Sequence, residues 1–323
     1  MIKYLYVLVS DETDDYLEQA LISITSLKMR MPEAFVSLLI DDITKKTLVD
    51  KRGNILELIN ELKGIEIDSQ FNKKARSRWL KTSMRRHIAG DFLYIDCDTV
   101  ICEDLTEIEN LGIDLGAVLD CHVLLHEHDA KEMFQNNDKL LGFDSSLKTN
   151  KHFNSGVIFC RDIPVCHSFF DEWHKLWLSG IKRRLIDQPS FNQANLNFDN
   201  IIKEVEGLWN CQICTGGIVF LVNAKIIHYF VTRKGSIPYT LADPLLIQKI
   251  KNTGIIDNDI KKLLTSPKNN FYLNTFLISN KKMQEIITSP LFSILRHIYD
   301  WSLIQLVNKL LVKIRNKMLN MKI

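Results

Sequence analysis

Residues 92–101 read FLYIDCDTVI. The four apolar residues Phe92–Ile95 form a run without a polar break, which is typical of a short strand at the centre of a parallel sheet. Asp96 and Asp98 follow at once, separated by Cys97. Two carboxylates this close repel each other unless a cation lies between them, and in a turn beyond a strand both can reach one hard metal ion. The stretch therefore predicts a central strand that ends at a metal-binding turn.

The chain before this stretch alternates between strand and helix signals. Lys3–Ser10 is a β-rich apolar run, and apolar residues then recur at helical spacing over residues 16–27. Phe35–Ile40 predicts a second strand, and helices are expected near Leu48–Leu62 and over Arg76–His87. This rhythm predicts right-handed βαβ units and an α/β fold with a mainly parallel central sheet.

Polar residues stand where the first two strands end. Ser10 and Asp11 follow the first, and Asp41 and Asp42 follow the second. Ligands of such sheets bind at the carboxyl ends of the strands, so we expect these side chains at the site. Helix capping is the alternative for both Asp41 and Asp42.

The chain after the aspartate pair carries further strand signals. Strands are expected at Leu115–Leu119, Gly156–Cys160, Gly217–Val222 and Lys225–Phe230. The polar stretch Gln135–His152 is long for a loop, and we expect a lid over a site there.

Composition limits the class of protein. The 323 residues include 41 basic and 39 acidic side chains, a net charge of +2, and 46% are apolar, so a full core is expected and a global attraction to nucleic acid is not. Seven irregularly spaced cysteines argue against a secreted disulfide framework. With no basic leader and no apolar run of about 18–20 residues, we expect a cytoplasmic protein, soluble or peripheral. We expect one domain over residues 1–250 and a helical region over 251–323.

The C-terminal region has its own pattern. From Leu291 to Met318 apolar residues recur at helical spacing, and no acid follows Asp300. An amphipathic, basic helix with aromatic residues suits an anionic membrane surface, and packing on the main domain or in a homodimer is the alternative. The basic residues are Lys309, Lys313, Arg315, Lys317 and Lys322.

Two classes of enzyme use a strand followed by Asp-X-Asp. In haloacid-dehalogenase-like phosphatases Asp96 would be a nucleophile and Asp98 an acid and base. In nucleotide-sugar transferases the pair binds a metal ion at the diphosphate. The phosphatase motif normally opens the first strand of its fold, whereas about three strand–helix elements precede it here. The flanking sequence therefore favours the transferase.

An ordered series of short motifs over Ile2–Lys234 resembles glycosyltransferase family 8, the retaining transferases that include bacterial lipopolysaccharide galactosyl- and glucosyltransferases and glycogenin. The family's metal motif stands here as LYIDCDTVICEDL, and its upstream Ala-Arg helix as ARSRWLKTS. Its Phe-Asn-Ala-Gly-Val stands as FNSGVIFCRD, its Asp-Gln pair lies in LIDQPSFNQANLN, and its late histidine follows a strand in AKIIHYF. The resemblance implies a single GT-A-like nucleotide-sugar-binding domain.

The resemblance also implies an activity and a set of site residues. It implies transfer of galactose or glucose from a UDP-sugar to a glycan or lipid-linked glycan, such as a lipopolysaccharide core, with Mn²⁺ or alternatively Mg²⁺. Asp96, Asp98 and His228 would hold the metal ion. Catalytic roles at the sugar fall to Asn154, Asp187 and Gln188. Further substrate contacts are implied for Ser10, Asp11, Asp41, Arg78, Lys81, Cys97, Ser155 and Lys234.

Several of these residues have a purely structural alternative. His228 is also compatible with a hydrogen-bonded core histidine, and Asn154 with a turn residue. Asp187 is also compatible with the cap of a helix expected over Ser190–Leu196.

Two further features bear on function. The family's Gly after the histidine and its Pro-Trp after the lysine are replaced within residues 231–236, which leaves a binding module without turnover as an alternative. His122, His126 and His128 lack the spacing of a metal signature, so we expect them in a surface loop or at the acceptor site.

Overall fold

The structure is a computed structural model. By internal contacts the chain divides into two units, Met1–Thr275 and Phe276–Ile323. The boundary expected from the sequence, after residue 250, falls inside helix α9 (Pro244–Thr253) of the first unit. The residues that the structure describes are 2–213, 216–229, 239–270, 285, 289–298, 301–304, 306–307 and 310–311.

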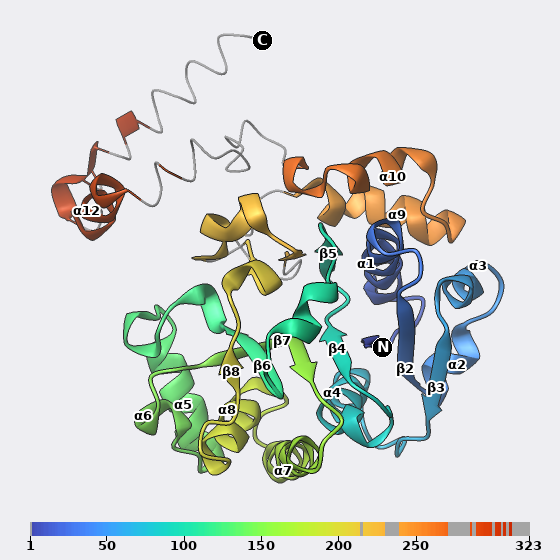
Figure 1. Cartoon of the computed structure of the whole chain (residues 1–323), viewed down its shortest axis with the longest axis horizontal. Coiled ribbons are helices and arrows are strands. Elements are labelled where there is room, and N and C mark those ends of the chain that lie inside the picture. The colour runs from blue at the N-terminus through green and yellow to red at the C-terminus, as the bar shows by residue number, and fades with distance from the viewer. Residues whose placement is uncertain are drawn as a thin grey trace. The chain divides into compact units, whose positions relative to one another are not determined.

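The first unit is built on a seven-stranded sheet with the order β3-β2-β1-β4-β7-β6-β8 (Figure 1). The first four of these strands run parallel to one another, and β7 is antiparallel to both β4 and β6. The mainly parallel sheet predicted from the sequence is thus confirmed. The strands are β1 (Lys3–Leu8), β2 (Phe35–Asp41), β3 (Glu61–Ile65), β4 (Phe92–Ile95), β6 (Leu115–Leu119), β7 (Phe153–Cys160) and β8 (Lys203–Glu204).

Strand β4 lies at the centre of this sheet, as its sequence predicts. All four of its residues are buried. Leu93 and Ile95 belong to one hydrophobic core, and Phe92 and Tyr94 belong to the core on the opposite face. Because side chains alternate between the two faces of a strand, only an unbroken apolar run can fill both cores.

Helices cover both faces of the sheet. α1 (Tyr16–Arg30) packs into the first core, and α4 (Lys73–Ser83) and α7 (Pro164–Gly180) pack into the second. The other helices of this unit are α2 (Asp42–Thr47), α3 (Asp50–Gly53), α5 (Lys131–Leu141), α6 (Ser145–Lys148), α8 (Gln188–Asn197) and α10 (Asn258–Thr265).

A second, three-stranded sheet has the order β5-β10-β9. Strand β5 (Thr99–Ile101) follows the aspartate pair directly, and β10 (Ile226–His228) runs antiparallel to it. β9 (Cys211–Gln212) pairs with β10 on its other side. This small sheet joins the end of the central strand to residues much later in the chain.

Three expectations from the sequence are wrong. The helix expected near Leu48–Leu62 is divided into α3, a 3-10 helix at Asn54–Leu58 and the start of edge strand β3. The strand expected at Gly217–Val222 lies in a 3-10 helix, Gly216–Asn223. The polar stretch Gln135–His152 is no long loop, because most of it forms α5 and α6.

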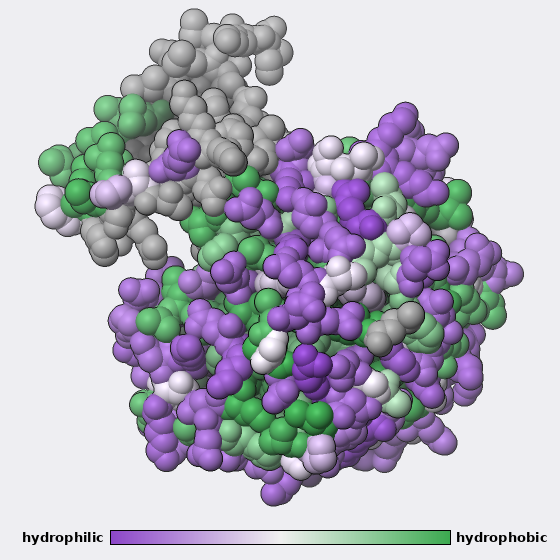
Figure 2. Space-filling model, in the orientation of Figure 1, coloured by the Kyte–Doolittle hydropathy of each residue, from purple (hydrophilic) through white to green (hydrophobic). Residues whose placement is uncertain are grey.

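The second unit contains α12 (Pro290–Ile298). Among the described residues, no helix is long and apolar enough to cross a membrane. The expected basic residues lie outside the described part of this unit. Large apolar side chains are exposed on it (Figure 2), namely Leu291, Phe292, Ile294, Leu295, Trp301, Leu303, Leu306, Val307, Leu310 and Leu311.

Candidate active site

The three residues predicted to bind a metal ion lie together. Asp96, Asp98 and His228 each offer a ligand atom, and these atoms lie within 4.8 Å of one another. Asp96 and Asp98 follow the carboxyl end of β4, and His228 ends β10. Since His228 pairs with Thr99 in the small sheet, its Nε2 comes within 3.2 Å of the Asp98 carboxylate. The pairing of β5 with β10 therefore assembles the group.

Asn154 anchors a chain of hydrogen bonds that leads to this histidine. Its Nδ2 donates to Asp120 (2.8 Å), and its Oδ1 accepts from the backbone N–H of Gly156 (2.9 Å). A carboxylate only accepts and a backbone N–H only donates, so the orientation of this amide is fixed. Asn154 lies on β7 and is buried, which makes it a buried anchor in a strand and not the turn residue that the sequence left open.

Asn210 links the fixed amide of Asn154 to the imidazole ring of His228. Its Nδ2 donates to Asn154 Oδ1 (3.0 Å), so its own Oδ1 accepts from His228 Nδ1 (2.9 Å). The proton of the neutral imidazole is therefore on Nδ1, and the lone pair on Nε2 points toward Asp98. A metal-binding histidine is held in this way by a partner on its other nitrogen.

The donor set fits a divalent metal ion. A site with an imidazole beside two carboxylates suits a first-row transition-metal ion such as Mn²⁺ better than Mg²⁺, which prefers oxygen ligands alone. Burial favours the neutral form of Asp98, but a protonated His228 imidazole beside it outweighs this effect and lowers the pKa of the carboxyl group. Gly156 makes room for the group, because a Cβ there would collide with the imidazole ring.

Lys81 lies between two carboxylates on the same side of the site. Its buried ammonium group is 3.1 Å from Asp96 and 3.6 Å from Asp187. The Tyr94 hydroxyl also donates to Asp96. Burial raises the pKa of Tyr94 well above its usual value, so this hydroxyl keeps its proton and remains a donor. Asp96 is thus held by two donors.

Asp187 pairs with Arg78 and does not cap α8. The side chain makes no capping hydrogen bond. One of its oxygens instead forms an ion pair with Arg78 (2.8 Å), and the other accepts a hydrogen bond from the Ser155 hydroxyl (2.9 Å). Burial favours the neutral acid, but Lys81 and Arg78 outweigh it and lower the pKa of Asp187 to about 2. Asp187 is therefore an anion that holds two cations beside Gln188, the first residue of α8.

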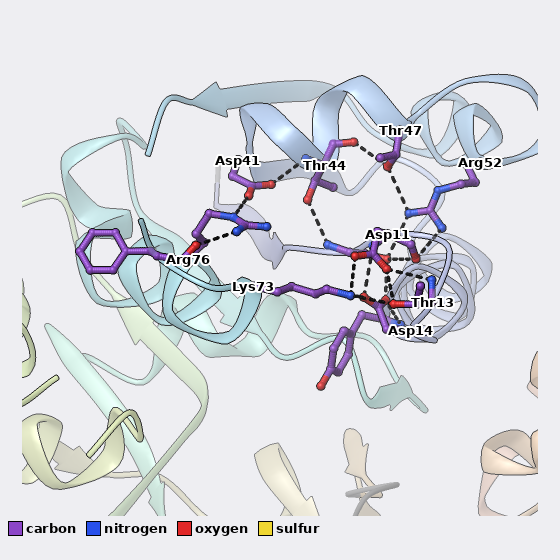
Figure 3. Close-up of polar contacts among 12 residues, drawn as sticks. Asp11, Thr13, Asp14, Asp41, Thr44, Thr47, Arg52, Lys73 and Arg76 are labelled. Carbon is purple, nitrogen blue, oxygen red and sulfur yellow. Dashed lines mark hydrogen bonds and ion pairs between the residues drawn. The ribbon is translucent and has the colours of Figure 1, made fainter. Parts of the chain in front are cut away.

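The polar residues after β1 form a separate network (Figure 3). The ammonium group of Lys73 bridges Asp11 (2.6 Å) and Asp14 (2.7 Å). Hydrogen bonds from Lys73 and from Thr13 lower the pKa of the Asp11 carboxyl group. The Ser10 hydroxyl donates to Asp14 (2.7 Å). These groups bind one another at the carboxyl end of β1, where the sequence predicts a nucleotide contact.

Asp41 has the capping role that the sequence left open as an alternative. Its Oδ1 accepts from the N–H of Thr44 in the first turn of α2 (2.8 Å), and its Oδ2 accepts from Arg76 (2.5 Å), as Figure 3 shows. The side chain is fully buried. A contact with the nucleotide by Asp41 stays a prediction.

The remaining predicted residues are placed as follows. Cys97 lies between the two aspartates, and burial raises the pKa of its thiol well above the usual value, so it stays protonated. Lys234 lies outside the described residues. His126 is exposed, on the 3-10 helix Leu125–Glu127, whereas His122 is half-buried and His128 is buried, so the expected position at the surface holds for His126 alone.

Asp120, Cys121 and His128 form a second close group, but hydrogen bonds account for it. The N–H of Ala130 donates to His128 Nδ1 (2.9 Å), so the proton of the neutral ring is on Nε2. That nitrogen donates to Asp120 (3.2 Å). A protonated nitrogen is no metal ligand. The role of His128 is therefore to position the Asp120 carboxylate, which accepts the hydrogen bond from Asn154.

The sequence interpretation missed Asp120, Tyr94 and Asn210. Asp120 directly follows strand β6, and an acid after an apolar run was a signal that could have found it. Asn210 ends a short 3-10 helix, Gly207–Asn210, and nothing local in the sequence distinguishes it.

A mainly parallel sheet covered by helices on both faces, with its central strand ending in Asp-X-Asp, defines a GT-A-like glycosyltransferase fold. The sequence model of glycosyl transferase family 8 matches residues 7–235. The chain therefore belongs to glycosyltransferase family 8, as its motifs indicate, and it is a glycosyltransferase. No curated protein sequence matches it.

Several solved glycosyltransferase structures are similar to this chain. The galactosyltransferase LgtC, in complex with donor and acceptor sugar analogues, has a TM-score of 0.52 at 12% identity and covers 81% of this chain and 99% of its own. The glycosyltransferase GlyE of Streptococcus pneumoniae has a TM-score of 0.48 at 17% identity, and the match covers 84% of this chain and 66% of its own. Mouse xyloside xylosyltransferase 1 has a TM-score of 0.46 at 13% identity, and the match covers 70% of this chain and 97% of its own.

Proposed function

We propose that this chain transfers galactose or glucose from a UDP-sugar to a hydroxyl of a glycan or lipid-linked glycan, with retention of configuration. The site would use a divalent ion, Mn²⁺ first, held by Asp96, Asp98 and His228. The single observation that carries this proposal is the approach of these three side chains to within 4.8 Å. The LgtC structure with donor and acceptor sugar analogues supports the donor and acceptor classes.

When bound, such an ion neutralises the negative charge that develops on the departing nucleoside diphosphate. The chain's own cations add to this. Lys81 is buried, and a charge acts more strongly where water is excluded. Asp187 holds Lys81 and Arg78 together, so both are in place before the substrate arrives. By the family resemblance Lys234 would contact the same diphosphate.

The sugar would lie beside β7 and the start of α8. Asn154 and Ser155 are consecutive on β7, and Ser155 is hydrogen-bonded to Asp187. Both Asp187 oxygens have donors, so we infer that Asp187 acts mainly by positioning Arg78. Gln188 follows directly, and by the family resemblance its amide acts at the anomeric carbon. Ser10, Asp11, Asp41 and Cys97 complete the proposed substrate contacts.

The second unit would place the enzyme at its acceptor. Its exposed apolar side chains and the basic residues that follow in the sequence suit the anionic surface of a membrane. A lipid-linked glycan at the cytoplasmic leaflet is then the proposed acceptor.

A panel of UDP-sugars tests the proposal. We expect Mn²⁺-dependent release of UDP from UDP-galactose or UDP-glucose, and a loss of about 100-fold or more in Asp98→Asn. Asp104→Asn is the matched control, because Asp104 is exposed and, among the described residues, its carboxylate accepts hydrogen bonds from Thr106 alone. UDP binding with no hydrolysis of any donor would indicate a binding module. Cleavage of a simple phosphate ester that Asp96→Asn abolishes would indicate a phosphatase.

A further inference from the structure

A basic pocket of about 480 Å³ opens beside the candidate active site. Four of its lining side chains are basic and none is acidic, although the whole chain has a net charge of only +2. A concentration of one sign of charge in a concave surface attracts an ion of the opposite sign. The pocket is lined by Asn72, Lys74, Ile181, Lys182, Arg183, Arg184, Leu185 and Ile186.

None of the four cations has a carboxylate partner within the described part of the chain. Arg183 donates to the backbone carbonyls of Leu140 (3.0 Å) and Ser179 (3.4 Å), which fixes the loop that carries it. In the same loop, Lys182 and Arg184 are exposed and form no ion pair with a described residue.

Helix α4 carries cations with carboxylate partners and one without. Lys73 is bound by two carboxylates and Arg76 by Asp41, whereas Lys74 between them forms no ion pair with a described residue. Its charge, with those of Lys182 and Arg184, is thus uncompensated. Like charges this close repel each other, and an anion between them would relieve the repulsion.

Two residues that line the pocket are close along the chain to residues of the candidate site. Lys74 and Arg78 are four residues apart on α4, so they share a face about 6 Å apart along the helix axis. Arg78 in turn contacts Asp187 at 2.8 Å. On the other side, Ile186 directly precedes Asp187. An anion in the pocket would therefore lie next to the sugar that is transferred.

We infer that this pocket binds a phosphate group of the acceptor, so that the molecule that receives the hexose is a phosphorylated saccharide. The inference rests on the proposed function. The diphosphate of the donor is assigned to the divalent ion that Asp96, Asp98 and His228 would hold, and none of these residues lines the pocket. A phosphate dianion balances more of the three free charges than a carboxylate does, and the Arg184 guanidinium can bind it with two parallel hydrogen bonds.

Calorimetry of the full chain, loaded with UDP and Mn²⁺, tests this inference. The probes are glucose 6-phosphate, glucuronate and glucose. We expect glucose 6-phosphate to bind at least about 10-fold more tightly than glucose, with glucuronate between them, because charge-assisted hydrogen bonds are the strong ones. The preference should disappear in Lys182→Gln/Arg184→Gln.

Lys203→Gln/Lys261→Gln removes the same charge from two exposed lysines that do not line the pocket and should keep the preference. Equal binding of the three probes, a preference that survives in Lys182→Gln/Arg184→Gln, or an equal loss in both double variants would overturn the inference. The proposed function fails separately, if the unaltered chain does not bind UDP with Mn²⁺ in the loading step.

Discussion

One buried amide decides which nitrogen of His228 faces the two aspartates. Asn210 accepts from His228 Nδ1 only because its other end donates to Asn154, and Asn154 is fixed by Asp120 and a backbone N–H. Four neutral or anionic groups thus set the tautomer of one histidine. The metal site depends on these partners as well as on its own ligands.

We expect Asn210→Leu to weaken Mn²⁺ binding by about 10- to 100-fold, the usual cost of losing a partner behind a ligand. The measurement is Mn²⁺ affinity by calorimetry or by electron paramagnetic resonance of the free ion. Asn195→Leu is the matched control, because Asn195 is equally buried and its Oδ1 accepts from Ile202 N–H. Wild-type affinity in Asn210→Leu, or an equal loss in both variants, would contradict the assignment.

Asp187 makes stability depend on pH. Its pKa is about 2 in the folded chain, against a usual value of 3.8, because Lys81 and Arg78 outweigh its burial. A lowered pKa stabilises the fold above pH 3.8, and this contribution is lost as the pH falls through 2. The two cations keep their charge throughout this range.

The free energy of unfolding of the wild type should therefore exceed that of Asp187→Asn most near neutral pH. The difference should shrink by about 2 kcal/mol as the pH falls from about 4 to about 2. Urea unfolding of both proteins at a series of pH values measures it. A difference that is constant with pH would show that Asp187 titrates normally in the folded chain.

At the scale of elements, helix α2 is tied to its neighbours through its first turn. Asp41 ends β2, accepts from Thr44 N–H of α2 and binds Arg76 of α4. One carboxylate therefore joins three elements beneath the proposed nucleotide site. Its role is to set where these elements meet.

Two substitutions separate the cap from the ion pair. Asp41→Asn keeps an acceptor for Thr44 N–H but loses the charge opposite Arg76, and Asp41→Ala loses both. We expect the free energy of unfolding to be lower in Asp41→Ala than in Asp41→Asn by about 1 kcal/mol, the usual value of a cap. Urea unfolding measures it. Equal stabilities would mean that the carboxylate serves the ion pair alone.

Elements with strong local signals were predictable, and elements set by distant contacts were not. β1, β2, β4 and α1 match their patterns because burial on a defined face imposes a period on the sequence. Edge strand β3 carries Glu61 and Lys63 in its half-exposed ladder, so it lacks an apolar run. The apolar run Gly217–Val222 folds as a 3-10 helix, because a short buried run fits either structure.

The stretch Gln135–His152, predicted as a lid, was also shaped by contacts that its local sequence does not show. Asp138 accepts from the Ser145 hydroxyl (2.9 Å) and from Ser146 N–H (2.8 Å), which joins α5 to α6. Gln193 of α8 accepts from the N–H groups of Asp144 and Ser145. The polar residues that suggested a loop in the sequence are thus used to hold helices together.

At the scale of the whole molecule, the chain divides into a unit with the candidate site and a second unit with exposed apolar side chains. We expect deletion of residues 291–323 to abolish binding to vesicles that contain phosphatidylglycerol, because both the apolar and the basic residues are removed. Hydrolysis of the UDP-sugar donor should continue.

Flotation of the vesicles measures the binding, and release of UDP measures the hydrolysis. Leu245→Ser, at a strongly exposed leucine of the first unit, is a control that should leave vesicle binding unchanged. If the truncated chain still floats with the vesicles, the membrane proposal is wrong.

The sequence by itself determined the central strand, the aspartate pair after it, the alternation of strands and helices, and the family. These features are carried by contiguous residues, since a buried strand or a motif is legible within about ten positions. The tertiary structure alone decided that β10 pairs with β5 and so brings His228 to Asp98. It also decided that Asn210 orients that imidazole and that Lys81 lies between Asp96 and Asp187. Such contacts join distant segments, and the stability of the whole fold selects them, so no local pattern records them.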